Sequence, residues 1–394
     1  MGTSSTGVGF HKQLVDDAVR FKAPARVPFI PHFYLWSALD QGYKISDVCT
    51  DFELNIKVQR NFHEKYKFDV FKSQSGLLCN PLAILEGIGT GFNVFNDDAE
   101  SIEIDDFQIM FGHDYDAFLA DWRRFLWEVM LPRKFPEWNN LKVSDLARHI
   151  GTYREFTSHL ATLSEIATKE LALPKMNAVA PAFLPVECFY MYWMGLQGAS
   201  KEVRRNPGKF QDAVALLDKE IIDPFVELVK QGVDVSESAF VTSVTFLAQN
   251  FMNSKQFGQY YWPTVKKILD AVTGQDQIMH IFAEGMIIRL ADFFRDVEKG
   301  HLAIQIEQDS PYDFVKALPN VACIGGVTTH YLGHTPADEC VAYVKRLIDD
   351  LGTSGGFLLA PDKMMSYRRD AKGENLKAVC DFVAEYWLAS AQEV

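Results

Sequence analysis

His280 and Glu284 are the residues whose types and spacing most directly suggest chemistry. His280 interrupts the apolar run Met279-His280-Ile281-Phe282-Ala283, and Glu284 follows it. A buried histidine needs a partner for its ring N–H, and a nearby carboxylate can supply one and tune the basicity of the ring. In the alternative interpretation, His280 only hydrogen-bonds a backbone carbonyl in the core, since buried polar groups are usually paired. We predict that both residues are catalytic and that they would be the ligands of any metal.

Further candidates follow other apolar runs of the chain. Eight such runs alternate with helical patterns, which is the signature of an α/β fold of the (β/α)8 TIM-barrel type. The runs cover residues 27–32, 68–73, 176–183, 240–246, 277–283, 302–307, 321–327 and 356–360.

In a TIM barrel the carboxyl ends of the strands form the active-site face. This rule adds Asp362 and Lys363 to the predicted catalytic residues. The predicted substrate-binding residues are His32, Tyr34, Lys72, Gln74, Asn250, Glu307 and His330. The same rule also selects Ser73, Glu187, Gln249 and Asp309, although some of these side chains will be structural.

The pattern predicts one domain over residues 1–394. About a hundred residues separate the second run from the third, which is too many for one crossover, so we expect a helical insertion at about 81–174. Within it, residues 114–129 and 143–171 show helical spacing. Elsewhere, the segment Thr50-Asp51-Phe52-Glu53 predicts a capping box, and Thr335-Pro336 predicts a threonine-capped helix start. Gly333 and that cap place His330 and His334 in a loop before the helix, which argues against a metal site there.

Composition limits the classes of partner. A formal charge of −13 and a pI near 5.3 argue against nucleic acid, because a phosphate backbone would be repelled. The six cysteines form no CxxC pair, which fits reduced thiols in a cytoplasmic protein. The longest apolar runs are far shorter than the roughly 20 residues that a membrane span needs. The first six residues lack the basic and apolar regions of a signal peptide, so we expect neither secretion nor membrane attachment.

The C-terminal quarter resembles a known family. Its segments are Val321-Ala322-Cys323-Ile324-Gly325-Gly326-Val327, then Thr335-Pro336-Ala337-Asp338-Glu339, then Gly355-Gly356-Phe357-Leu358-Leu359. They are similar to the seventh strand, the following helix and the eighth strand of the uroporphyrinogen decarboxylase superfamily. The resemblance implies a TIM barrel, and by family analogy a homodimer.

Two branches of that superfamily predict different chemistry. Its zinc-dependent methyltransferases exchange methyl groups with a corrinoid and carry His-x-Cys at the fifth strand and another Cys after the eighth. This chain has His280-Ile281-Phe282 and Pro361-Asp362-Lys363 there, so two of the three zinc ligands are absent. A replacement site of His280, Glu284 and Asp362 or Glu307 is chemically allowed, because zinc accepts nitrogen and carboxylate oxygen. The true decarboxylases carry an Arg-Gln-Ala-Gly-Arg segment, whereas residues 33–42 here contain no arginine.

The resemblance is therefore closer to the methyltransferase-like branch than to true uroporphyrinogen decarboxylase. It implies methyl transfer between a small methoxy, methylamine or methylthio substrate and a corrinoid on a partner protein, with zinc as a further cofactor. One alternative is a decarboxylase of a small carboxylate or a tetrapyrrole, with Lys363 and His280 as cation and acid. The other is a non-catalytic protein that binds a corrinoid or tetrapyrrole.

Overall fold

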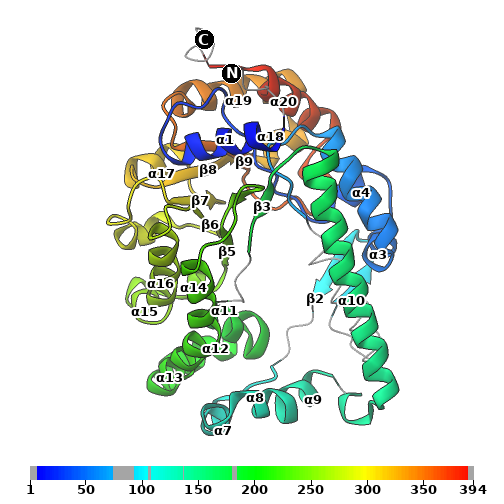
Figure 1. Cartoon of the computed structure of the whole chain (residues 1–394), viewed down its shortest axis with the longest axis vertical. Helices are drawn as coiled ribbons and strands as arrows, with labels where there is room; N and C mark the ends of the chain where they lie inside the picture. The colour runs from blue at the N-terminus through cyan, green and yellow to red at the C-terminus, as the bar shows by residue number, and fades with distance from the viewer. Residues whose placement is uncertain (1–6, 74–92, 105–107, 136, 180–183, 389–394) are drawn as a thin grey trace.

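Five parallel strands make up the continuous part of the central barrel. The computed structural model describes residues 7–73, 93–104, 108–135, 137–179 and 184–388 (Figure 1). The five strands are hydrogen-bonded in chain order, and they are β5 (Thr242–Phe246), β6 (Met279–Ala283), β7 (Leu302–Ile306), β8 (Ala322–Val327) and β9 (Phe357–Pro361). In their register, His280 lies opposite Ser243 on one side and Ala303 on the other.

The other side of the barrel has a thinner hydrogen-bond ladder. Phe29 pairs with Leu359 of β9, the Asp69 amide donates to the Phe29 carbonyl, and Phe71 pairs with Lys175. The predicted strands at 27–32 and 68–73 therefore exist only as isolated bridges. The first of them contains Pro28 and Pro31, which have no N–H to donate to a ladder.

Two more predicted strands need correction. The run at 176–183 gives a short β3 (Lys175–Asn177), and residues 180–183 lie outside the described residues. The run at 240–246 is divided at Val241 into β4 (Ser238–Phe240), which pairs with β3, and β5, which pairs with β6. The chain changes partners there, and the Val241 amide donates to the carbonyl of Ile278.

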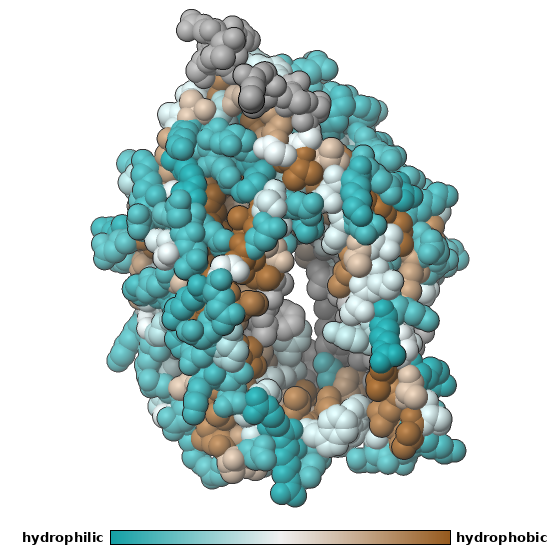
Figure 2. All heavy atoms as spheres, viewed as in Figure 1, coloured by the Kyte–Doolittle hydropathy of each residue, from teal (hydrophilic) through white to brown (hydrophobic). Residues whose placement is uncertain are grey.

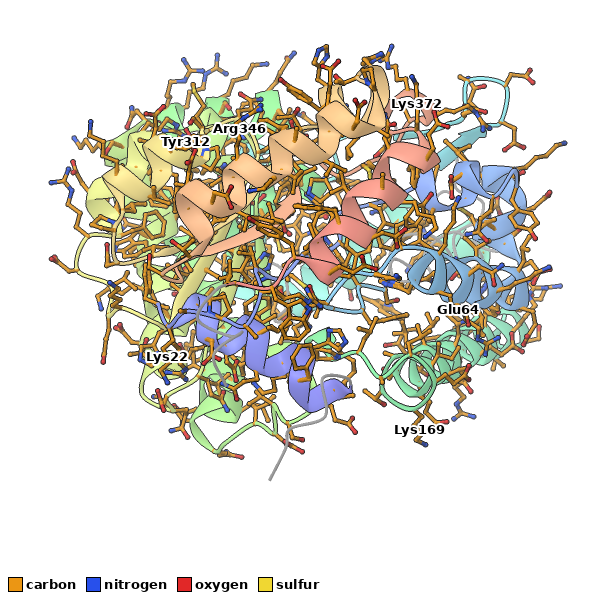
Figure 3. All side chains as sticks on the ribbon, turned by 90° about the horizontal axis from the view of Figure 1, so that it is seen from above. Lys22, Glu64, Lys169, Tyr312, Arg346 and Lys372 are labelled. Carbon is orange, nitrogen blue, oxygen red and sulfur yellow. The ribbon has the colours of Figure 1, made fainter. Side chains whose placement is uncertain are left out.

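An N-terminal helix, α1 (Val8–Val19), closes the amino end of the barrel. Its residues Val15, Ala18 and Val19 form one buried cluster with the inward-facing residues Ile30, Val70, Phe240, Ile278, Ala303, Ile324 and Leu358. In Figure 3 this helix lies across the end of the barrel, while the labelled residues Glu64 and Arg346 lie at the periphery. The sequence analysis did not predict this helix.

A shell of helices covers the outward face of the strands. Because side chains alternate along a strand, Met279, Ile281 and Ala283 face this shell while His280 faces inward. Its main helices are α4 (Phe52–Lys65), α13 (Pro207–Leu217), α14 (Asp223–Lys230), α16 (Trp262–Thr273), α17 (Pro311–Ala317), α19 (Ala337–Leu347) and α20 (Gly373–Glu385). The other helices are α2 (Trp36–Asp40), α3 (Ile45–Thr50), α11 (Pro185–Glu187), α12 (Gly195–Arg205), α15 (Ser254–Gln256) and α18 (Thr329–His334).

The segment between Phe71 and Lys175 leaves the barrel and returns to it. Its described elements are β1 (Asn93–Asn96), β2 (Ser101–Ile104), α7 (Tyr115–Ala120), α8 (Trp122–Phe125), α9 (Leu131–Lys134) and α10 (Val143–Glu165). In Figure 1, α7, α8 and α9 lie beyond the carboxyl ends of the strands, and α10 runs from them back to α4 at the side of the barrel. Figure 2 shows the surface hollowed between α7–α9 and the barrel. Among the described residues, no helix combines the length and apolar character that crossing a bilayer requires.

Three local predictions were wrong in detail. Asp51, rather than Thr50, caps α4 by accepting from the Leu54 amide at 3.0 Å, because the Thr50 hydroxyl is already bonded to the Ser46 carbonyl. Thr335 does not cap α19, whose N-cap is Pro336. His330 and His334 do not lie in a loop, since α18 includes both; its cap is Thr328, which accepts from the Tyr331 amide.

Candidate active site

The inward-facing positions of the barrel change from apolar to polar above the layer that α1 covers. Two residues after Ile30 and Val70 come His32 and Lys72, and two after Ile278 and Ala303 come His280 and Gln305. We call His32, Lys72, His280 and Gln305 the barrel floor. His32, His280 and Gln305 are at most 2% exposed, whereas Lys72 is partly exposed. Two strands and two extended segments of the chain therefore bring four polar side chains together around the barrel axis.

Several polar atoms of the floor have no hydrogen-bond partner among the described residues. His280 has a 3.2 Å contact from Nδ1 to the Ser243 hydroxyl, but its Nε2 is unpaired, as is Nδ1 of His32. Both amide atoms of Gln305 are unpaired as well. Because buried polar groups are normally satisfied, such a concentration indicates a place where a ligand or ordered water completes the bonding.

The floor carries positive charge on Lys72 and neutral imidazoles around it. Burial lowers the pKa of His280 to about 3; the Lys72 charge adds to this effect, and the neighbouring Gln305 side chain opposes it. Burial also lowers the pKa of His32, with Lys72 and His280 contributing. Burial lowers the pKa of Lys72 to about 8, so the ammonium form still dominates at pH 7. Neutral histidines can then donate or accept at the site without competing for a counter-ion.

Above the floor lies an acidic rim made by Asn250, Glu284, Arg289 and Glu307. These four residues help line a pocket of about 490 Å³. The Gly285 amide donates to Glu307 at 2.7 Å, and the Asn250 side chain donates to the Glu284 carbonyl at 3.0 Å. Burial and the neighbouring Glu307 raise the pKa of Glu284. The structure thus places Glu284 with Glu307 and Asn250, and gives His280 a hydroxyl partner instead of the predicted carboxylate.

Glu187, at the end of α11, is a buried carboxyl group beside the rim. It accepts from the Leu247 and Ala248 amides at 2.8 and 3.0 Å and from the Tyr261 hydroxyl. Burial raises its pKa to about 7 although these hydrogen bonds oppose the shift, and the charge of Glu284 adds to it. A carboxyl group that titrates near neutral pH is suited to move protons.

Glu187 should make the stability of the protein fall as pH rises. The folded state holds this proton with a pKa near 7, compared with 4.5 for an ordinary glutamate, so stability is lost between those values. We expect Glu187→Gln to reduce the loss of unfolding free energy between pH 5 and pH 8 by about 2–3 kcal/mol. Urea unfolding at both pH values measures this, with the exposed Glu64→Gln as control. An identical pH dependence in Glu187→Gln and wild type would contradict the assignment.

The structure gives the remaining predicted residues other partners. Lys363 forms an ion pair of 2.8 Å with the buried Asp370, and Asp362 accepts from the Thr329 amide at 3.0 Å. Tyr34 packs against a small apolar cluster under α2 and α3, and burial raises its pKa to about 12. His330 is exposed on α18, with its ring centroid 5.5 Å from that of His334. Gln74 lies outside the described residues.

The side chains around His280 are not those of a zinc site. Within the described part of the chain, no three side chains of His, Cys, Asp or Glu come together as metal ligands. His280 has one unpaired nitrogen to offer, but the side chains around it are Lys72, Ser243, Gln305 and His32. An ammonium and an amide are poor substitutes for thiolates, so these residues do not fit a zinc site.

Sequence analysis missed Thr242, Ser243, Gln305 and Arg289. Gln305 had a signal that could have revealed it, because it interrupts the apolar run Leu302-Ala303-Ile304-Gln305-Ile306 as His280 interrupts its own. Thr242 and Ser243 gave no such signal, since hydroxyl residues are common in strands. Arg289 follows its strand by six residues, and its guanidinium bonds the carbonyls of Gln249 and Met252.

Comparison with known proteins decides the family. The family model of uroporphyrinogen decarboxylase (URO-D) matches residues 139–386, which is more than half of the chain. The chain belongs to the URO-D family. Among solved structures, a methyltransferase from Methanosarcina mazei is similar with a TM-score of 0.63 and 12% sequence identity, covering 96% of this chain and 99% of that one. At this identity the similarity establishes the URO-D barrel fold. No curated protein matches the sequence.

Proposed function

We propose that this URO-D family protein transfers a methyl group between a small methylated substrate and a corrinoid carried by a partner protein. The observation that carries the proposal is the unpaired Nε2 of His280 in the polar floor of the barrel. The overall similarity to a methyltransferase supports the same class of reaction. When bound, the corrinoid would supply the nucleophile that accepts the methyl group.

The residues of this chain would act on the heteroatom that loses the methyl group. That atom must be polarised or protonated as its bond to carbon breaks. If the Ser243 hydroxyl donates to Nδ1 of His280, the neutral imidazole carries its proton on Nε2 and can donate it in a hydrogen bond to the heteroatom. Glu187 and Glu284, whose pKa values burial raises, can hold the proton that the leaving group takes.

A decarboxylase is the second candidate, and Lys72 favours it. Decarboxylation needs a cation near the carboxylate and an acid to protonate the carbanion. Lys363 cannot act as a free cation in the geometry observed, because Asp370 neutralises it. Lys72 has no carboxylate partner among the described residues, so it replaces Lys363 in this hypothesis.

Methyl transfer can be tested with reduced cobalamin and a panel of methoxy, methylamine and methylthio compounds. We expect one chemical class to methylate the cobalamin in the presence of the protein, which absorbance detects, with an equal amount of demethylated product by mass spectrometry. A parallel assay follows labelled carbon dioxide released from small carboxylic acids. Carbon dioxide release without methyl transfer would overturn the proposal in favour of the decarboxylase.

A further inference from the structure

We propose that the barrel floor binds a single carboxylate of the substrate and that the acidic rim rejects a second one. The inference deepens the proposed function, because it names the substrate as a small methylated compound with one carboxylate group. It rests on the proposed function only for the methyl group. Carboxylate binding itself is a property of Lys72, His280 and Gln305.

The hydrogen-bonding capacity of the floor matches a carboxylate. Lys72 offers an ammonium group and Gln305 an unpaired amide. His280 adds an unpaired Nε2, which donates when the Ser243 hydroxyl donates to Nδ1. His32 is bonded to the Pro361 carbonyl through its other nitrogen, so its unpaired Nδ1 is an acceptor. The floor itself contains no acidic residue. A carboxylate has about four acceptor positions, so it can satisfy several of these groups at once.

Charge favours the same ligand. The ammonium of Lys72 is partly desolvated, and this burial lowers its pKa. No acidic side chain of the described chain pairs with it. An anion that pairs with a desolvated cation replaces the hydration that the cation loses on burial. Charge-assisted hydrogen bonds of this kind are stronger than hydrogen bonds between neutral groups. An uncharged ligand would leave the ammonium uncompensated. The site is therefore selective for an anion over its neutral isostere.

The rim sets the limit of one carboxylate. Glu307 is two residues beyond Gln305 on the same inward-facing row, which places it roughly 7 Å further along the barrel axis. Glu284 lies beside Glu307 in the rim, close enough for the charge of Glu307 to raise the pKa of Glu284. The one cation of the rim, Arg289, already donates to the Gln249 and Met252 carbonyls. A second carboxylate of the ligand would therefore meet Glu284 and Glu307, and like charges at close range cost affinity. A polar or cationic end would be accepted.

Acetate is the first probe, measured by ligand-detected NMR titration of the full-length protein at pH 7. We expect saturable binding of acetate, no binding of acetamide, and weaker binding of succinate than of acetate. Lys72→Met, which keeps the length of the side chain, should weaken acetate binding about 10- to 100-fold. Lys255→Met is the matched control, because Lys255 is an exposed cation on α15, and it should leave the affinity unchanged.

Binding of acetate should also weaken as pH rises through about 8, since Lys72 then loses its charge. His32 and His280 are already neutral in this range, and Glu284 and Glu307 are the acidic groups that face the site from the rim. Gln305→Leu is a second variant that preserves volume, and it should weaken binding if Lys72→Met does not fold.

Two results would overturn the inference: no saturable acetate binding by the folded wild type, or equal affinity in wild type and the folded Lys72→Met variant. The experiments distinguish failure of this inference from failure of the proposed function. Methyl transfer from neutral compounds without acetate binding would support the function and reject the carboxylate site. Acetate binding without methyl transfer would support the site and reject the function.

Discussion

Replacing Asp69 by asparagine is expected to lower the free energy of unfolding by about 3–5 kcal/mol. Asp69 is completely buried and binds the guanidinium of Arg26, which is 4% exposed. It also contacts Nδ1 of His11 in α1 at 2.8 Å and accepts from the Phe29 amide at 2.8 Å. This network joins the helix that closes the barrel to the first two strand segments. The variant would leave Arg26 as an unpaired buried charge.

Urea unfolding followed by circular dichroism measures the effect at pH 7. The control is Asp270→Asn in the exposed pair that Lys266 and Asp270 form on α16, which should cost less than about 1 kcal/mol. A loss below about 1 kcal/mol in Asp69→Asn would contradict the assignment of this network to stability.

The same network should also determine how the stability of the protein changes at acid pH. Burial alone would raise the pKa of Asp69, but Arg26 and His11 outweigh it and hold the pKa well below the usual range. The stabilisation is therefore fully present above the ordinary aspartate pKa and is lost as pH falls towards the folded value. Asp69→Asn should flatten the acid limb of the stability profile.

Replacing His280 by leucine is expected to slow the reaction by a factor of about 100 to 10,000, which is the range for loss of a positioned acid–base or hydrogen-bonding group. Leucine approximates the volume of the ring but cannot polarise a heteroatom. Because Nε2 of His280 has no partner in the described chain, little stability should be lost. The measurements are the turnover number for the substrate that the panel identifies and the urea midpoint of the same preparation.

A matched control is His301→Leu. His301 is also buried, but its Nδ1 is paired with the Gln277 carbonyl at 2.8 Å, beside the start of β7 and away from the floor. Its replacement should lower stability and leave turnover unchanged. If His280→Leu retained wild-type turnover, His280 would be excluded from the mechanism and the alternative of a merely structural histidine would hold.

Much of the barrel could be predicted from the sequence because its strands are buried on both faces. The runs around His280, Gln305 and Cys323 are almost wholly apolar, and this pattern identified β6, β7 and β8. The first strand was harder, because its two prolines keep it out of a regular ladder. The helix α1 was missed although half of its twelve residues are apolar, and their role appears only where they meet the barrel cluster.

The candidate site was predicted unevenly for a related reason. The strand-end rule found His32, Lys72 and His280, since each follows or interrupts an apolar run. It also selected Lys363, which an ion pair with Asp370 occupies, and His330, which faces solvent on α18. The position of a residue relative to a strand predicts its height along the barrel axis. It does not predict which neighbouring group its side chain contacts.

The sequence by itself determined a (β/α)8 barrel and the polar residues at the ends of its strands, because strand alternation and apolar runs are local properties of the chain. The family came from the resemblance of the C-terminal segments. Only the tertiary structure decided that Glu284 joins Glu307 and Asn250, while His280 lies with Lys72 and Gln305. The physical reason is register. Neighbouring strands come from distant parts of the chain, and their hydrogen-bond alignment sets which side chains share a layer.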